Sequence, residues 1–383
     1  MLMKDIAVII PVYNGADMLM PCIDYVLQAG ERIAEVIVVD DGSTDDTLRT
    51  ALKCAESDQR IRVIHKNNNG SYAARITGIQ ASVSPYLAFA DVDDRFYPGS
   101  LDMLAVLLEL NDADVAMGSY REVTTLEPVI TVREKPIVRS ITDDQMWPRI
   151  MKWKTQEFVN YVWNKLYKRE LLSDLKEADD INQGDDVLIT CQAFLNVRKI
   201  VETTEPVYMY FQNPGSITRE GFGKSDLNLI RVWDMIVSIM KEKKPDLLPM
   251  ALFNRWRLDF TLITRLILVD DRIVDRKYEK DLHIWRKNLK EHWKDLVFSH
   301  AMPKNRELLV IALRFCFLPT KALLRLGRKM TKTETSVLLH SGDKKTHVLL
   351  LSEGKEKMHF HGRENKQMND SGSQKQSSYE RTD

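Results

Sequence analysis

The sequence is poor in cysteine and carries no net charge. Its 383 residues include four cysteines, and 55 basic residues balance 55 acidic ones. The cysteines, at positions 22, 54, 191 and 316, lie far apart. This spacing excludes a zinc finger and predicts a reducing, cytoplasmic compartment. Because a neutral chain has no global attraction for polyanions, we expect no nucleic-acid partner.

Long apolar runs and glycine-rich phosphate loops are also missing. No stretch reaches the roughly 18 apolar residues that a membrane-spanning helix needs, and the apolar run before "PVYN" is too short for a signal peptide. We therefore expect neither a membrane span nor export by an N-terminal signal. The motifs GxGxxG and GxxxxGK[ST] are absent as well. A bound diphosphate would need another positive partner.

What the first 120 residues do contain is a regular alternation of short apolar runs with helical patterns. The apolar runs, which are continuous and rich in β-branched or aromatic residues, lie at 6–10, 35–39, 61–64, 86–90 and 114–118. Candidate helices lie between them at about 16–29, 44–57, 71–83 and 98–111. Continuous apolar strands are typical of a sheet covered on both faces. The alternation predicts an α/β fold with a mainly parallel, Rossmann-like sheet flanked by helices.

Polar clusters follow four of these predicted strands: "PVYNG", "DDGSTDD", "HKNNNG" and "DVDD". Loop formation and helix capping explain any one of them, but four in succession predict a ligand site beyond the carboxyl ends of the strands. In an extended D-x-D turn, Asp91 and Asp93 project to the same side. Two such carboxylates can hold Mg²⁺ or Mn²⁺, and the cation then neutralises phosphate oxygens.

The segments "VIIPVYNG", "VIVVDDGSTDDT", "NNNGSYAARITGIQAS" and "YLAFADVDD", in this order, resemble the N-terminal half of family 2 glycosyltransferases. The resemblance is strong over about 5–120 and looser over 155–220. It implies the GT-A fold and inverting transfer from a nucleotide sugar, with a UDP-hexose as the expected donor. It also implies a catalytic domain over 1–220, in which 1–120 bind the nucleotide sugar and 121–220 supply catalysis and the acceptor site.

The resemblance assigns nucleotide-sugar binding to Pro11, Tyr13, Asp40, Asp41, Arg75, Asp91 and Val92, and metal binding to Asp91 and Asp93. The Tyr13 ring would stack on the nucleobase. Of the adjacent Asp40 and Asp41, one would accept a hydrogen bond from the base and the other would reach the ribose or the metal. The sequence does not show which aspartate has which role. Val92, in the middle of the D-x-D, should point its side chain away from the side on which Asp91 and Asp93 project.

Arg75 matches an arginine of the family motif and would stay charged near the diphosphate. Its neighbour Ile76 stands where the family usually has asparagine, which leaves the sugar contact there undefined. The simpler interpretations are a packing aromatic for Tyr13 and a surface salt bridge for Arg75.

The resemblance places the catalytic base in "INQGDDVLITCQAFLN" (181–196). An inverting transfer needs a carboxylate that takes the proton of the acceptor hydroxyl. The family commonly has Glu-Asp here with the aspartate as base, so Asp186 is the expected base and Asp185 takes the place of the glutamate. The alternative is capping of a helix N-terminus. Near Ser216 and Thr218, a loop is expected to close over the diphosphate.

The remainder, 221–333, is expected to form a helical C-terminal region, and 334–383 a disordered tail. One predicted helix places Leu229, Trp233, Ile236 and Met240 on a single face. Residues 304–332 contain eight Lys or Arg and one Glu around an apolar run, with Pro319 marking a break. This composition favours a basic helix in the plane of a membrane surface, and the alternative is a last core helix.

Three functions fit an α/β protein of this kind. A glycosyltransferase acting in cell-surface or exopolysaccharide synthesis is the leading hypothesis, with a saccharide or lipid-linked acceptor and a peripheral position at the inner face of the cell membrane. A nucleotidyltransferase would need a basic triphosphate signature, and 8–20 contain no Lys or Arg. An inactive binding module should have lost the D-x-D or the Asp185–Asp186 pair, and both are present.

Overall fold

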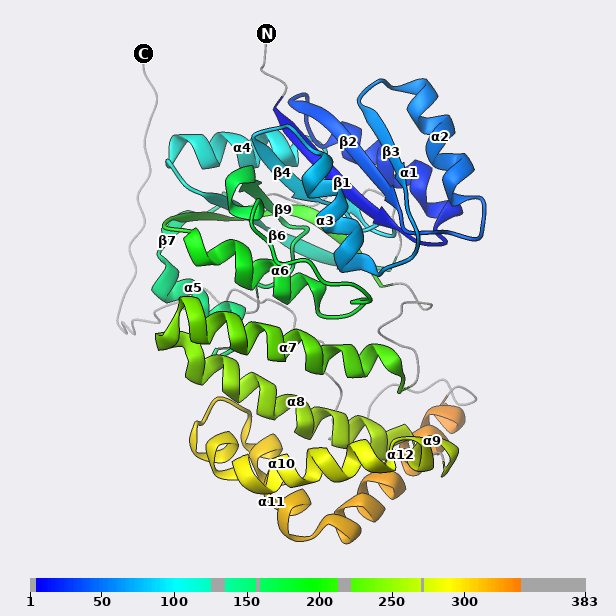
Figure 1. Ribbon diagram of the computed structural model, residues 1–383, viewed down its shortest axis with the longest axis vertical. Helices are drawn as coiled ribbons and strands as arrows, with labels where there is room; N and C mark the ends of the chain where they lie inside the picture. The colour runs from blue at the N-terminus through cyan, green and yellow to red at the C-terminus, as the bar shows by residue number, and fades with distance from the viewer. Residues whose placement is uncertain (1–4, 125–134, 156–158, 213–221, 270–271, 339–383) are drawn as a thin grey trace, which may run out of the picture. The chain divides into compact units, whose positions relative to one another are not determined.

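The computed structural model describes residues 5–124, 135–155, 159–212, 222–269 and 272–338 (Figure 1). Its strands are β1 Ile6–Val12, β2 Ile33–Asp40, β3 Ile61–His65, β4 Tyr86–Phe89, β5 Arg95–Phe96, β6 Val115–Val123, β7 Val138–Ile141, β8 Lys165–Lys168 and β9 Ile200–Phe211. Its α-helices are α1 Ala16–Gln28, α2 Thr47–Ser57, α3 Ser71–Ala81, α4 Ser100–Leu110, α5 Asp143–Ile150, α6 Asp185–Ala193, α7 Lys224–Lys243, α8 Leu248–Val269, α9 Arg272–Lys277, α10 Glu279–Phe298, α11 Lys304–Phe315 and α12 Phe317–Leu338. Each strand and helix expected in the first 120 residues is confirmed, with ends that shift by a few residues.

The strands of the described residues form one sheet in the order β3-β2-β1-β4-β8-β6-β9-β5, and β7 pairs with β9. The first four strands of this order are parallel, as predicted. The other half is mixed, because β8 runs antiparallel to both of its neighbours and β5 and β7 run antiparallel to β9. Because β6 and β9 are parallel to each other and run in the same direction as β4, the sheet is mainly parallel, as predicted, and β5, β7 and β8 are its antiparallel strands.

The register of the parallel strands brings their polar ends together. Val12 lies opposite Asp40, and Asp40 lies opposite His65. Ile9 lies opposite Phe89, the last residue of β4. The turns that follow β1, β2, β3 and β4 therefore leave the same edge of the sheet, where the sequence predicts the ligand site.

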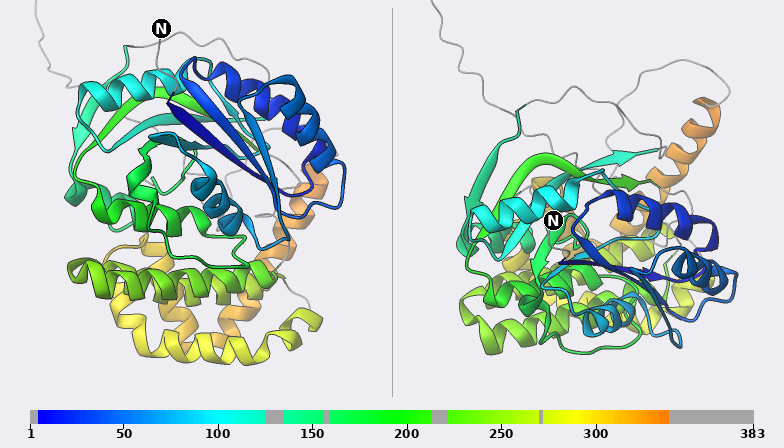
Figure 2. Two further views of the ribbon diagram at one scale, coloured as in Figure 1. Left: turned by 45° about the horizontal axis from the view of Figure 1, so that its top comes forward. Right: turned by 90° about the horizontal axis from the view of Figure 1, so that it is seen from above.

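Helices cover both faces of the sheet (Figure 2). One face packs its alternate strand residues, among them Ile6 and Val8, against buried residues of α1, α2 and α4. The opposite face, which includes Ala7 and Ile9, packs against α3, α5 and α6. The strands are apolar on both sides because both faces are covered.

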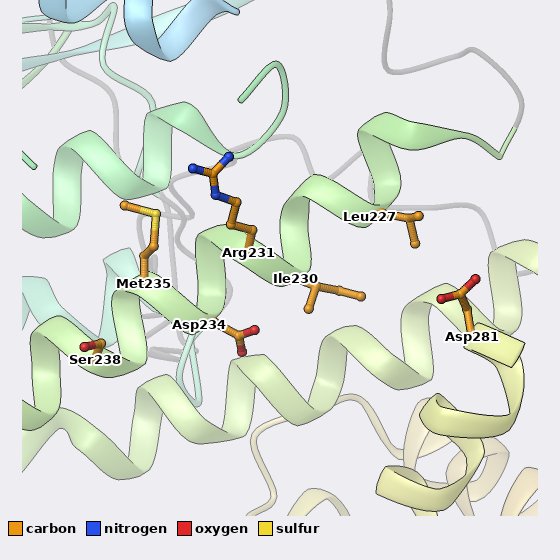
Figure 3. Close-up of a pocket in the computed structure, with 7 residues that line it drawn as sticks. All are labelled: Leu227, Ile230, Arg231, Asp234, Met235, Ser238 and Asp281. Atoms are coloured by element: carbon orange, nitrogen blue, oxygen red, sulfur yellow. The ribbon is translucent and has the colours of Figure 1, made fainter. Parts of the chain in front are cut away.

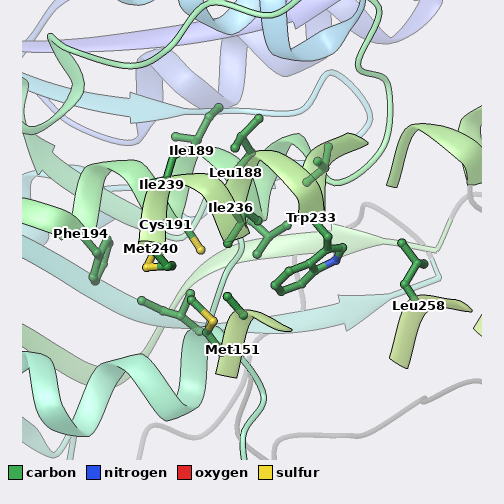
Figure 4. Close-up of a cluster of buried hydrophobic side chains, with 14 of the residues drawn as sticks. Met151, Leu188, Ile189, Cys191, Phe194, Trp233, Ile236, Ile239, Met240 and Leu258 are labelled. Carbon is green, nitrogen blue, oxygen red and sulfur yellow. The ribbon is translucent and has the colours of Figure 1, made fainter. Parts of the chain in front are cut away.

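The second of these cores continues into the C-terminal helices (Figure 4). The predicted apolar face of α7 is confirmed, since Trp233, Ile236 and Met240 are buried and Leu229 packs partly buried against them. These side chains share the cluster with Leu188 and Cys191 of α6, and α6 packs against α7. The packing of α7 therefore stabilises the position of the helix that begins at Asp185.

The basic segment 304–332 forms two helices rather than one. The break falls at Cys316, the C-cap of α11, and Pro319 lies in the first turn of α12, where proline is tolerated. Val310 and Leu313 are buried in the core. None of the helices in the described ranges is both long enough and apolar enough to cross a membrane. The loop with Ser216 and Thr218, and most of the expected disordered tail, lie outside the described residues.

Candidate active site

The turn after β4 carries Asp91, Asp93 and Asp94. The Asp91 backbone N–H donates to the Tyr208 hydroxyl at 2.9 Å, and Asp94 Oδ1 accepts from the Phe211 backbone N–H at 2.8 Å. These bonds fix the turn against β9. Burial, followed by repulsion from Asp91, raises the pKa of Asp93 to about 6. Burial and both neighbouring carboxylates raise the pKa of Asp94 well above its usual range. The turn concentrates more negative charge than its surroundings neutralise.

Arg75 connects this turn to the start of α6. Its side chain projects from α3 and is buried, with 4% of the residue exposed. Its guanidinium donates to Asp91 Oδ1 at 2.5 Å and to Asp185 Oδ2. Removing one partner from a buried ion pair typically destabilises a protein by about 3–5 kcal/mol. Arg75 is thus a buried bridge between carboxylates, not a surface salt bridge, and its contact with a diphosphate stays a prediction.

Asp185 and Asp186 open α6 as predicted, and their environments differ. Asp185 is mostly buried, and its Oδ2 accepts from the Ser71 hydroxyl at 2.9 Å as well as from Arg75. Asp186 keeps 25% of its side chain exposed, and its buried Oδ1 has no hydrogen-bond partner among the described residues. Burial raises the pKa of Asp186 to about 6, against the opposing charge of Arg75. Of the two, Asp186 is the carboxylate that is free to accept a proton.

The start of α6 depends on Gly184. This residue has φ +82°, which is strained for any residue with a Cβ, and a Cβ here would lie 2.8 Å from the Leu229 side chain of α7. The tight turn lets α7 approach closely while the chain turns into α6. Asp185 and Asp186 therefore occupy the first turn of a helix whose position α7 fixes.

Asp40 and Asp41 organise the turn between β2 and α2. Asp40 is fully buried; its Oδ1 accepts from the Ser43 N–H at 3.1 Å and its Oδ2 lies 2.7 Å from His65 Nδ1. Asp41 accepts from Lys66 Nζ at 2.8 Å and from the Gly70 N–H at 2.8 Å. The two aspartates thus tie the turns after β2 and β3 together. Their expected contacts with base and ribose are not tested by these bonds.

The remaining predicted binding residues lie close to these turns. Pro11 belongs to the carboxyl end of β1, and Tyr13 follows that strand with half of its surface exposed, as a ring available for stacking would be. Val92 is partly buried and packs against the core under α1. Its assignment to nucleotide-sugar binding stays a prediction.

The acidic turn suits a cation that shares its coordination with a substrate. No three His, Cys, Asp or Glu side chains converge as a ready-made metal cage in the described part of the chain. Mg²⁺ in nucleotide sites is commonly held by one or two carboxylates together with substrate phosphates and water. The raised pKa values of Asp93 and Asp94, which follow from burial and from repulsion between the carboxylates, indicate a negative site that a cation would relieve.

Sequence reasoning missed several residues of this site. His65 and Lys66 pair with the two aspartates after β2, and the motif "HKNNNG" contains them without showing those partners. Lys165 of β8 is fully buried, and burial lowers its pKa to about 7 while Asp186 acts in the opposite direction. The sequence feature that could have drawn attention to Tyr208 and Trp163 is the alternation of aromatic residues in "VYMYF" and "YVW".

A shallow hollow elsewhere does not compete with this site. A cavity of about 540 Å³ lies along the outer side of α7 and is lined mainly by that helix, with Asp281 of α10 at one end (Figure 3). It contains none of the predicted site residues. Two of its charged side chains already have partners: Asp234 pairs with Arg255 at 2.6 Å, and Arg231 donates to the Asp179 carbonyl at 2.7 Å.

Residues 7–176 match the family model of glycosyl transferase family 2. This part of the chain is a family 2 glycosyltransferase domain, and the resemblance seen in the motifs is confirmed. The match covers less than half of the chain, so the activity of the whole protein remains a proposal.

Among its relatives, the glycosyltransferase EpsJ of Bacillus subtilis is 32% identical over 216 residues, which are 56% of this chain and 62% of the relative. The glycosyltransferase YibD of Escherichia coli is 26% identical over 62% of this chain and 70% of the relative. The S. aureus TarS 1–349 structure in complex with UDP-GlcNAc has a TM-score of 0.59 and 18% identity, and covers 91% of this chain and 95% of that one. The likeness to TarS shows a shared fold.

Proposed function

We propose that this enzyme is an inverting, metal-dependent glycosyltransferase that moves a hexose from a UDP-hexose to a saccharide or lipid-linked saccharide of a cell-surface or exopolysaccharide. The bridge that Arg75 forms between Asp91 and Asp185 carries the proposal. It brings the D-x-D turn beside the pair that contains the expected base, although 110 residues separate Arg75 from Asp185. Donor activation and proton removal need this proximity.

Asp91 and Asp93 would hold Mg²⁺ or Mn²⁺, and the repulsion between them supports that assignment. When bound, the cation stabilises the charge of the departing nucleoside diphosphate. Pro11, Tyr13, Asp40 and Asp41 would bind the nucleoside, with the half-exposed Tyr13 ring on the base.

Asp186 would act as general base. The bond between the anomeric carbon and the phosphate oxygen breaks while the acceptor oxygen bonds to the same carbon from the opposite side. Asp186 receives the hydroxyl proton, and the nucleoside diphosphate leaves with the bonding electrons. Asp185 and Arg75 position this carboxylate, because their hydrogen bonds fix the first turn of α6 against α3.

The direct test is donor cleavage by the full chain. UDP-, GDP- and dTDP-hexoses are incubated with the enzyme and Mn²⁺, with EDTA replacing Mn²⁺ in matched samples, and released nucleoside diphosphate is measured. We expect release from a UDP-hexose that EDTA abolishes. Equal release in EDTA would refute the metal dependence, and release from none of the donors would refute the donor class.

We also propose that α11 and α12 attach the enzyme to the inner, anionic face of the cell membrane. These helices expose large apolar side chains: Leu308, Phe315, Leu318, Leu323 and Leu326 are each between 58% and 75% exposed. Lys321 and Arg325 pair with Asp275 of α9, so two of the eight basic residues face the protein. An exposed basic residue such as Lys304 can add about 1 kcal/mol near an anionic surface, and salt weakens this attraction.

Replacing Leu318, Leu323 and Leu326 by glutamine is expected to lower binding to phosphatidylglycerol vesicles at least tenfold, because insertion of each leucine contributes on the order of 1 kcal/mol or more. The buried side chains of α11 stay intact in this variant. A matched control replaces Val83 and Leu110, which are 81% and 79% exposed elsewhere on the protein. Co-sedimentation measures binding. Equal binding of variant and wild type, or no binding by the wild type, would make these helices ordinary packing elements.

A further inference from the structure

The helix α3, which carries Arg75, begins without a capping side chain of its own. Its N-cap is Gly70, which has φ +92° and no side chain that could accept a hydrogen bond from the first turn. The first backbone N–H groups of a helix have no partner within the helix, and a capping side chain normally satisfies one of them. Partners for the start of α3 must therefore come from another part of the chain.

The segment that leads into α6 supplies these partners. The Ser71 N–H donates to Asn182 Oδ1 at 3.2 Å, although 111 positions separate the two residues. The Tyr72 N–H donates to the Ile181 carbonyl oxygen at 3.1 Å. The first turn of α3 is therefore capped by the residues that lie just before Asp185.

The Ser71 side chain makes the reciprocal contact. Its hydroxyl donates to Asp185 Oδ2 at 2.9 Å, and the Ile181 carbonyl oxygen is a second acceptor at 3.3 Å. Arg75 donates to the same Oδ2, and it lies one helical turn after Ser71 on the same face of α3. Asp185 is thus bound from two positions of one helix. Because Asp186 is the next residue, these bonds also fix the position of the expected base.

The two segments approach each other most closely at Gly70. A Cβ at this position would lie 2.7 Å from the Ile181 carbonyl oxygen and 2.9 Å from the Ile181 nitrogen, which is too close for any side chain. The Gly70 N–H also donates to Asp41 Oδ2 at 2.8 Å. The turn that contacts an expected nucleoside-binding aspartate is therefore packed directly against the approach to the expected base.

We propose that Ser71 is a positioning residue for the catalytic base: by binding Asp185, it fixes Asp186 relative to the turns that bind the nucleotide sugar. This inference rests on the proposed glycosyl transfer, in which Asp186 takes the acceptor proton. A general base must lie within hydrogen-bond reach of the proton that it removes, while the donor is bound by the turns after β2 and β4. Ser71 acts through Asp185 and needs no contact with either substrate.

The test compares Ser71→Ala with Ser71→Thr, which keeps the hydroxyl. UDP release is measured from UDP-glucose, UDP-galactose and UDP-N-acetylglucosamine with Mn²⁺ and with water as the acceptor, and the kinetics use the donor that the wild type cleaves fastest. Ser71→Ala should lower kcat about tenfold at an unchanged KM, because displacement of the base slows the reaction without altering donor binding. Ser71→Thr should retain most of the wild-type kcat. The matched control is Ser57→Ala, which removes an exposed hydroxyl that donates to the Lys53 carbonyl in α2.

Two further measurements separate positioning from a loss of structure. When Ser71→Ala is added to Asp186→Asn, the two losses should not multiply, because Ser71 acts only through the base. UDP affinity with Mn²⁺, measured calorimetrically, should be equal in Ser71→Ala and the wild type.

Four results would overturn the proposal while leaving the proposed function in place. They are an unchanged kcat in Ser71→Ala, an equal loss in Ser71→Thr, a fall in UDP affinity, and losses that multiply fully in the double variant. UDP release by the wild type from none of the three donors would instead overturn the proposed function, and this inference with it.

Discussion

Asp186→Asn is expected to slow sugar transfer by about 10²–10⁴-fold, the usual contribution of a general base, while donor affinity stays unchanged. Asparagine keeps the shape of the side chain and removes its ability to take a proton. Asp186 has the more exposed side chain of the pair, 25% against 12%, and its Oδ1 has no hydrogen-bond partner in the described part of the chain. Transfer rates and donor affinity, measured on the same preparation, check both halves of this expectation.

The pH profile separates Asp186 from its neighbour. Because the base must be unprotonated and its pKa is raised to about 6, the wild-type rate should fall as the pH drops through about 6, or somewhat lower once a bound cation adds positive charge. Asp185→Asn should keep this acidic limb, since the Asp185 carboxylate serves Arg75 and Ser71. If Asp185→Asn abolished activity while Asp186→Asn stayed fully active, Asp185 rather than Asp186 would be the base.

Asp93→Ala is expected to abolish the Mn²⁺-dependent part of UDP binding, with affinity falling by at least a hundredfold, while the protein stays folded. The carboxylate that repels Asp91 in the free protein is the one that a cation needs, so its removal weakens metal binding without removing a structural partner. Calorimetric titration with UDP, with and without Mn²⁺, measures the change.

A second readout separates loss of the metal from loss of the fold. The folded-state pKa of Asp93 is raised above its unfolded value, so its ionisation destabilises the metal-free protein as the pH rises from about 4 through about 6. At neutral pH the alanine variant should therefore unfold at the same urea concentration as the wild type, or a higher one. Asp144→Ala, which changes an exposed residue of α5, is the control. An unchanged UDP affinity with Mn²⁺ would show that Asp93 does not bind the metal.

The first half of the fold was predictable because its signals are local. Each of β1 to β4 is a short apolar run, and each polar turn follows directly in the sequence. The later strands carry weaker signals: β8 reads "KLYK", and the burial of its first lysine contradicts the ordinary behaviour of that residue type. The antiparallel insertion of β8 between β4 and β6 depends on long-range pairing that periodicity does not record.

The site was predictable in its residue types but not in its connections. The motifs single out Arg75, Asp91 and Asp185, yet only the folded chain shows that one guanidinium holds both carboxylates. The aromatic rings around Trp163 come from three separate segments, and the sequence of one segment does not indicate which other segments it contacts. Buried ion pairs and ring stacks form between residues far apart in sequence, so a pattern along the chain gives the candidates without the geometry.

The measurement that tests the central claim most directly is the stereochemistry of donor cleavage. Proton NMR follows a cleaved UDP-α-hexose in the presence of Mg²⁺, at an enzyme concentration high enough to outrun mutarotation of the free sugar. The proposed single displacement predicts that the β-anomer appears first, that EDTA stops its formation, and that Asp186→Asn slows it. An α-anomer as the first product, or cleavage that proceeds equally in EDTA, would contradict an inverting, metal-dependent transfer at this site.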